Sequence, residues 1–173
     1  MTVRRLNHAV LYVRDVATSV AFYERALGFE VITQMPNAAF LRASGSTNDH
    51  DLGLFAIGAQ AGPSGAGTAT VGLYHLAWEV ETLAQLRDLR ETLTSMGALV
   101  GETDHSTTKS LYAHDPDGLE FEVCWIVPAD RLDDAIKDGT MELRQLDLDA
   151  ELARFGADTV GGLGVSWPVT SSG

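Results

Sequence analysis

Cysteine and basic residues are scarce in this chain. Its 173 residues contain one cysteine, Cys124, which excludes an intramolecular disulfide framework and fits a reducing cytoplasm best. Lysine and arginine number 12 against 24 aspartates and glutamates, so the net charge is −12. Nucleic acids and anionic membrane surfaces are bound by clustered basic side chains. Neither is therefore expected as a partner.

Long apolar runs are also missing. No run approaches the ~18 apolar residues that span a membrane, and the first eight residues lack the apolar region of a signal peptide. Hydrophobic residues make up 45% of the chain and charged residues 21%, which is ordinary for a globular protein. A chain of this length can form one well-buried core, and it is too short for two large independent domains. We expect a soluble, cytoplasmic protein.

Two stretches of the chain repeat each other at an interval of roughly 67 residues. Leu-Asn-His8-Ala-Val in the first corresponds to Leu-Tyr-His75-Leu-Ala in the second. Apolar periodicity and turn residues predict the elements strand, helix, strand, strand, strand at 5–13, 16–27, 29–34, 39–43 and 50–57, and again at 72–80, 82–96, 98–103, 107–114 and 118–127. Residues 58–70 are a Gly-rich connector with little to bury. The sequence thus predicts an α+β fold of two βαβββ modules.

The ends of the predicted helices carry recognisable signals. Asp15 is a suitable N-cap for the first helix, and Gly28 is suited to the left-handed conformation that ends it. Gly97 closes the second helix in the same way. Beyond Pro128 the repeat stops, and short helices are expected at 129–137 and 146–155.

The last predicted strand of the second half alternates between two kinds of side chain. It follows the turn tetrapeptide Asp115-Pro-Asp-Gly118, so the strands at 107–114 and 118–127 form a hairpin. One face carries apolar residues and the other carries Glu120, Glu122 and Cys124. Carboxylates on an inner face need a positive partner, and a metal ion is the obvious candidate. His105 and Tyr112 precede the turn and bring acid–base groups to the same hairpin.

The repeat, with a histidine opening each half and a glutamate closing the second, resembles the vicinal oxygen chelate superfamily over about residues 4–127. The resemblance implies a single domain at 1–128, with modules at 4–58 and 72–127, a linker at 59–71 and a C-terminal helical extension and tail at 129–173. It implies one curved mixed sheet around a metal site. The implied ligands are His8, His75 and Glu122. Two histidines and one carboxylate with open positions suit non-haem Fe(II) oxygen chemistry, and Mn(II) is the alternative.

Within the superfamily, the chain resembles the type I extradiol catechol dioxygenases. His50-Asp-Leu-Gly-Leu-Phe55 resembles the segment whose histidine points at dioxygen, and His105 and Tyr112 fall where that family has its substrate-contacting histidine and tyrosine. The resemblance implies His50, His105 and Tyr112 as catalytic residues, a catechol-type diol and O2 as substrates, and a homo-oligomer. The connector at 58–70 and Leu119, where asparagine is usual, depart from the family pattern.

Other interpretations remain open. Glu120 and Glu79 compete with Glu122 as the carboxylate ligand, and His114 shares a face with Tyr112. A glyoxalase-like isomerase or lyase would use the same three ligands without needing His50, His105 and Tyr112 together. Glyoxalase I itself has a fourth ligand, a glutamate at the end of the first half, where this chain has the apolar residues 54–57. A small-molecule binding protein would use the same cleft without the metal.

Overall fold

The computed structural model describes residues 2–66, 69–137 and 142–166. Its first module contains β1 (Ala9–Val13), α1 (Val16–Leu27), β2 (Glu30–Met35), β3 (Ala38–Arg42) and β4 (Leu52–Ala56). Its second module contains β5 (Leu76–Glu79), α2 (Leu83–Ser95), β6 (Leu99–Asp104), β7 (Thr108–His114) and β8 (Glu120–Ile126). The α+β class and the repeated βαβββ order are confirmed.

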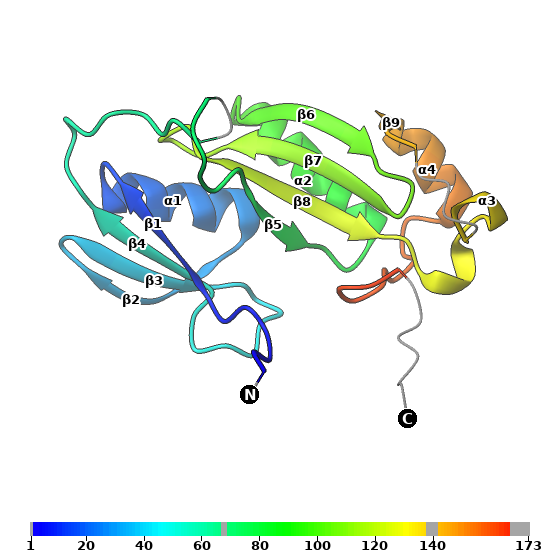
Figure 1. Cartoon of the computed structure of the whole chain (residues 1–173), viewed down its shortest axis with the longest axis horizontal. Coiled ribbons are helices and arrows are strands. Elements are labelled where there is room, and N and C mark those ends of the chain that lie inside the picture. Colours follow the sequence, from blue (N-terminus) through cyan, green and yellow to red (C-terminus); the bar gives the residue numbers. More distant parts are fainter. Residues whose placement is uncertain (1, 67–68, 138–141, 167–173) are drawn as a thin grey trace. The chain divides into compact units, whose positions relative to one another are not determined.

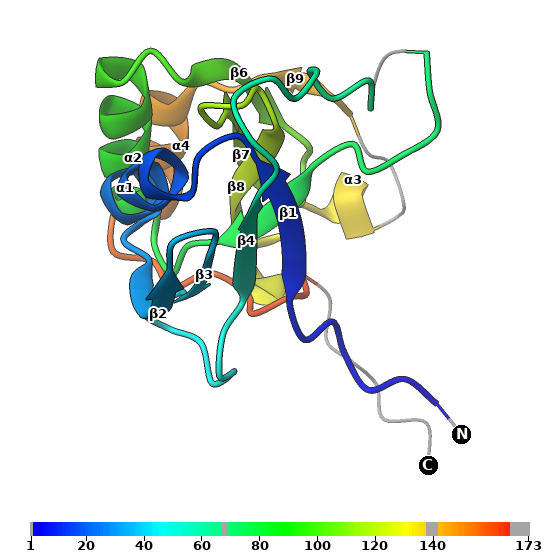
Figure 2. The same ribbon diagram turned by 90° about the vertical axis from the view of Figure 1, so that its left-hand side faces the viewer.

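The strands form two mixed sheets, one in each module. The first has the order β1-β4-β3-β2 and the second the order β5-β8-β7-β6-β9, in which β9 (Arg144–Gln145) comes from the C-terminal extension (Figures 1 and 2). In each module the first and last strands pair in parallel, and the other pairs within the module are antiparallel. The sequence predicted one curved sheet. Among the described residues the hydrogen bonds define two sheets, and each opening strand pairs with the closing strand of its own module at the edge of its sheet.

The chain divides into two compact units, which we call the first unit (1–65 and 115–119) and the second unit (66–114 and 120–173). The predicted turn at 115–118 is present, and it belongs to the first unit. Asp115 Oδ1 accepts hydrogen bonds from the backbone N–H groups of Asp117 and Leu119, both at 2.9 Å. Tyr23 donates its hydroxyl proton to Asp115 Oδ2 at 3.2 Å, and Arg14 Nη1 lies 2.7 Å from Asp117 Oδ1.

Helix α1 has the bounds and caps that the sequence predicted. The Asp15 side chain accepts from Thr18 N at 2.7 Å, and Gly28 ends the helix at a φ of 66°. An Asp at this position satisfies one of the otherwise unpaired N–H groups of the first turn. The helix buries Val16, Val20, Tyr23 and Ala26. Figure 2 shows it along one face of the first sheet.

The second sheet is covered by α2 and by the C-terminal extension (Figure 1). Helix α2 begins with a capping box between Thr82 and Gln85, and it buries Leu83, Leu86 and Leu93. The extension contains a 3₁₀ turn (Ala129–Arg131), α3 (Asp134–Lys137), β9 (Arg144–Gln145) and α4 (Leu148–Phe155).

The helix predicted at 129–137 is interrupted. Leu132 adopts extended backbone with φ of −69° and ψ of 138°, and its side chain is buried. The extended backbone at Leu132 ends the 3₁₀ turn before α3 begins, and it accompanies burial of the Leu132 side chain. Helix α4 confirms the helix predicted near 146–155, whereas β9 was not predicted. No helix in the described part of the chain is long and apolar enough to cross a membrane.

Candidate active site

The second unit brings together two of the three predicted metal ligands, His75 and Glu122. His75 immediately precedes β5, and Glu122 lies in β8 opposite Ala77 in the parallel ladder. His75 Nε2 is 3.2 Å from Glu122 Oε2. Two ligand atoms at about 2.1 Å from one metal, at a right angle, lie about 3.0 Å apart. The observed separation therefore fits a shared metal as well as a charge-assisted contact.

A second carboxylate lies on the other nitrogen of the same imidazole. His75 Nδ1 is 3.5 Å from Glu120 Oε1, and neither of these buried atoms has a hydrogen-bond partner in the described part of the chain. His114 Nε2 is 3.7 Å from Glu120 Oε2. Tyr74 also hydrogen-bonds the Glu120 carboxylate. Its Oε1 is nevertheless buried without a donor in the described part of the chain, which favours a cation beside it. The donor set thus fits a divalent metal held through Nε2 and Glu122, with Glu120 behind the ring.

Tyr112 and His105 form a hydrogen-bonded pair next to these ligands. His105 Nε2 is 2.7 Å from the Tyr112 hydroxyl oxygen. Tyr112 lies opposite Glu122 in the β7–β8 ladder, and its ring centroid is 5.7 Å from that of His75. Burial, followed by the charge of Glu122, raises the pKa of Tyr112 to about 12. The phenol therefore stays protonated near neutral pH and can donate a hydrogen bond.

The other two predicted residues lie together in the first unit. His8 immediately precedes β1 as His75 precedes β5, which confirms their equivalence in the repeat. The His8 and His50 ring centroids are 4.5 Å apart, and His50 also packs against Phe40 at 5.0 Å. His8 Nδ1 is 2.7 Å from Asn7 Oδ1. This contact leaves Nε2 as the ring nitrogen available to a metal.

Asp51 orders the loop that carries His50. Its carboxylate accepts hydrogen bonds from Ala43 N at 2.9 Å, the Ser46 hydroxyl at 2.7 Å and Asn48 Nδ2 at 2.7 Å. The backbone of Asp51 also joins the parallel pairing of β1 and β4, since Ala9 N donates to its carbonyl at 2.9 Å. The hydrogen bonds of Asp51 therefore hold the adjacent residue His50 close to the start of β4.

The six predicted residues fall into two groups, one in each unit. Within the described residues of either unit, no three His, Cys, Asp or Glu side chains form a metal-binding group. Glu79 is engaged elsewhere, because its Oε2 accepts from Gly164 N at 3.1 Å. Burial, with the charges of Glu122 and Glu79, raises the pKa of Cys124 to about 12, so its thiol is neutral. The Gly164 contact makes Glu79 a weaker candidate than Glu122 for the carboxylate ligand.

The structure also contains a buried cation that sequence analysis did not single out. Lys109 in β7 is 1% exposed and lies between Asp104 and Glu151. Strand alternation offered a signal, because Lys109 shares its face of β7 with Leu111 and Ala113, which are fully buried. A lysine on the buried face of a strand needs a buried carboxylate as its partner.

Two characterised enzymes share sequence with this chain. Biphenyl-2,3-diol 1,2-dioxygenase 3 of Rhodococcus globerulus is 35% identical over 125 residues, which cover 69% of this chain and 62% of that enzyme. Catechol-2,3-dioxygenase of Bacillus subtilis is 27% identical over 121 residues, covering 68% of this chain and 40% of the enzyme. The chain therefore matches less than two thirds of the length of either relative.

Solved structures share the fold. A glyoxalase/dioxygenase from Nostoc punctiforme superposes with a TM-score of 0.56 at 24% identity, covering 70% of this chain and 90% of that one. The fosfomycin resistance protein FosX of Listeria monocytogenes gives a TM-score of 0.54 at 18% identity, with 71% and 93% covered. At these identities the likeness concerns the fold alone.

The family profile covers most of the chain. The Glyoxalase/Bleomycin resistance protein/Dioxygenase superfamily matches residues 5–123, which include most of both modules and every predicted site residue. The match ends just after Glu122, so the C-terminal extension lies outside it. The chain belongs to this superfamily, which is the vicinal oxygen chelate superfamily.

Proposed function

We propose that this protein is an Fe(II)-dependent extradiol dioxygenase that cleaves a catechol-type diol with O2. One observation carries the proposal: the Tyr112–His105 hydrogen bond lies beside the His75–Glu122 pair on one sheet. A protonated phenol and an imidazole next to a metal are suited to moving protons on a bound diol. The names of the two characterised relatives support the same reaction.

The proposed ligands are His8 from the first unit and His75 and Glu122 from the second. Their equivalent places in the repeat, the 3.2 Å contact between His75 and Glu122, and the available Nε2 of His8 support this set. Fe(II), when bound, would supply Lewis acidity toward a catechol hydroxyl and redox chemistry toward dioxygen. Mn(II) accepts the same ligands and is an alternative metal.

The remaining residues would handle protons and charge. A bound catechol must lose a proton, and His105 is suited to accept it because its imidazole can act as a general base beside the Tyr112 hydroxyl. Tyr112 would hydrogen-bond the ring oxygen through its protonated hydroxyl. His50 would stabilise the negative charge that develops on oxygen, an electrostatic role.

We also propose that the protein acts as a homo-oligomer.

Anaerobic metal loading tests the proposal. The protein is titrated with Fe(II) or Mn(II) without oxygen, freed of excess metal, and mixed with a panel of catechols in air-saturated buffer. We expect a yellow ring-opened product and oxygen consumption. Iron binding without loss of any catechol would instead favour the isomerase or lyase interpretation, and no metal binding would favour a binding protein.

A further inference from the structure

His105 sits in a short turn between β6 and β7 with unusual backbone geometry. His105 N donates to Thr108 O at 2.9 Å, and Thr107 N donates to His105 O at 2.8 Å. Ser106 has a φ of 69°, and it is the only non-glycine residue with positive φ in the described part of the chain. L-residues seldom adopt this conformation without support from their surroundings. The turn that presents His105 therefore needs external contacts to keep its shape.

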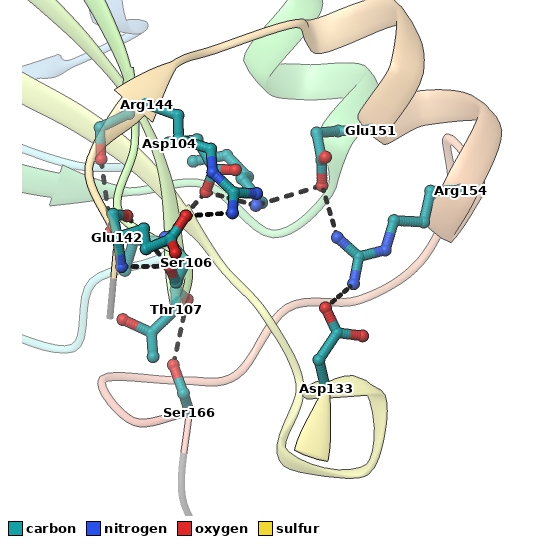
Figure 3. A network of polar contacts seen from close by, with 12 residues as sticks. Asp104, Ser106, Thr107, Asp133, Glu142, Arg144, Glu151, Arg154 and Ser166 are labelled. Atoms are coloured by element: carbon teal, nitrogen blue, oxygen red, sulfur yellow. Dashed lines mark hydrogen bonds and ion pairs between the residues drawn. The ribbon is translucent and has the colours of Figure 1, made fainter. Parts of the chain in front are cut away.

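Asp104 supplies one of these contacts, and Lys109 holds Asp104. Asp104 Oδ1 accepts from Ser106 N at 2.8 Å, and the same oxygen lies 2.5 Å from Lys109 Nζ. Lys109 is 1% exposed, so its charge must be met inside the protein. Its second partner is Glu151 of α4, with Oε2 at 3.1 Å. A continuous series of contacts thus runs from α4 through Lys109 and Asp104 to the turn. Figure 3 labels Glu151, Asp104 and Ser106 along this series.

The rest of the C-terminal extension contacts the same turn directly. The Ser106 hydroxyl donates to the Glu142 carbonyl and accepts from the Glu142 N–H, each at 3.0 Å. Strand β9 pairs with the end of β6, with Arg144 opposite Asp104. The Ser166 hydroxyl donates to Thr107 O at 3.1 Å (Figure 3). All these residues lie in the second unit.

Lys109 itself cannot reach the face that carries the candidate site. Alternation along β7 puts Lys109 on the opposite face from Tyr112, against α4, where its Nζ is 5.9 Å from the ring centroid of Phe155. Any effect of Lys109 on the site must therefore pass through the backbone of the turn. That makes its role one of positioning.

We propose that Lys109, clamped between Asp104 and Glu151, is a positioning residue that uses the C-terminal extension to hold His105 in hydrogen-bonding reach of Tyr112. The proposal rests on the proposed function for its catalytic consequence. The positioning itself concerns only the second unit and can be measured without turnover. The extension lies beyond the residues that match the superfamily.

The test compares Lys109→Met, Lys109→Arg and Glu151→Gln with the control Asp133→Asn. The control removes one of the two carboxylate partners of Arg154 in α4, at 2.6 Å, and leaves Lys109 and Asp104 paired (Figure 3). The ring nitrogen NMR signals of His105 are followed in the full-length, metal-free protein. The chain has five histidines, and His105→Gln assigns the signal.

We expect the His105 signal to lose the signature of its Tyr112 hydrogen bond in Lys109→Met and Glu151→Gln, and to keep it in Lys109→Arg and Asp133→Asn. If catechols are cleaved, kcat should fall on the order of ten- to a hundred-fold in the first two variants, with KM and iron content unchanged. An unchanged His105 signal in Glu151→Gln would overturn the proposal, even if Lys109→Met failed to fold. If the His105 signal changes in Lys109→Met and Glu151→Gln but the wild-type protein cleaves no catechol, the positioning role is supported and the proposed dioxygenase function is rejected.

Discussion

The Tyr112 hydroxyl oxygen lies 2.7 Å from His105 Nε2, although the two residues are seven positions apart in sequence. Tyr112 projects from the middle of β7, and His105 reaches back to it from the turn that precedes the strand. Burial raises the pKa of Tyr112 to about 12, so this pair joins a protonated phenol to an imidazole, which has a basic ring nitrogen. In such a pair the Tyr112 hydroxyl can donate its proton in a hydrogen bond, while the His105 imidazole can accept a proton from a substrate.

Replacing Tyr112 by phenylalanine should remove the hydroxyl and leave the ring in place. We expect kcat to fall by roughly 10²–10⁴-fold, which is the usual contribution of a positioned proton donor. Iron stoichiometry should not change, because the hydroxyl is not a proposed ligand. Steady-state kinetics and metal analysis of the same preparation measure both quantities. Unchanged turnover would remove Tyr112 from the mechanism.

Glu122 and Glu120 should differ in their effect on metal binding. Glu122→Gln removes a proposed ligand, so stoichiometric binding should be lost. Glu120→Gln removes only the carboxylate 3.5 Å from His75 Nδ1, and a partner of that kind is typically worth 10–100-fold in affinity. Competition with a metal-binding dye measures both variants. If Glu120→Gln lost the metal and Glu122→Gln kept it, the two assignments would have to be exchanged.

The contribution of Asp115 to the stability of the protein should decrease as pH rises. Burial raises the pKa of Asp115 above its ordinary value of 3.8, so the unfolded chain releases this proton at lower pH than the folded protein does. The contribution of Asp115 to the free energy of unfolding therefore declines from about pH 3.8 up to the raised pKa. Asp115→Asn keeps the Oδ1 acceptor and removes the titration.

Urea unfolding at several pH values compares Asp115→Asn with the wild type. The free energy of unfolding of the variant, minus that of the wild type, should rise with pH across this window and then level off. A difference that stays constant with pH would show that Asp115 does not titrate differently in the folded protein.

The capping box of α2 should contribute measurably to stability. Thr82 Oγ1 accepts from Gln85 N at 3.3 Å, and Gln85 Oε1 accepts from Thr82 N at 3.1 Å. Thr82→Ala should lower the free energy of unfolding by about 1 kcal/mol. Thr94→Ala, in the exposed last turn of the same helix, is the control and should be nearly neutral. Equal effects of the two substitutions would argue against the cap.

Local signals in the sequence predicted much of the fold. The bounds of α1 followed from Asp15 and Gly28 because each satisfies a specific need of a helix end. His8 and His75 were paired by the repeat, and both precede the first strand of their module. The hairpin around residues 115–118 followed from its turn residues.

Contacts between distant segments could not be predicted in the same way. The partners of Lys109 come from β6 and α4, and nothing in the local pattern specifies which carboxylates will approach a buried lysine. The break at Leu132 depends on burial of one side chain in a core assembled from elsewhere. The grouping of the strands in two sheets depends on pairing partners that alternation alone does not choose.

Isotopically labelled dioxygen tests the dioxygenase proposal most directly. The iron-loaded protein is mixed with the best catechol under labelled gas, and the product is reduced at once so that its carbonyl oxygen cannot exchange with water. Mass spectrometry should find both labelled atoms in one ring-opened product. A product with one labelled atom or none, or a catechol recovered intact beside fully bound iron, would contradict the proposed function.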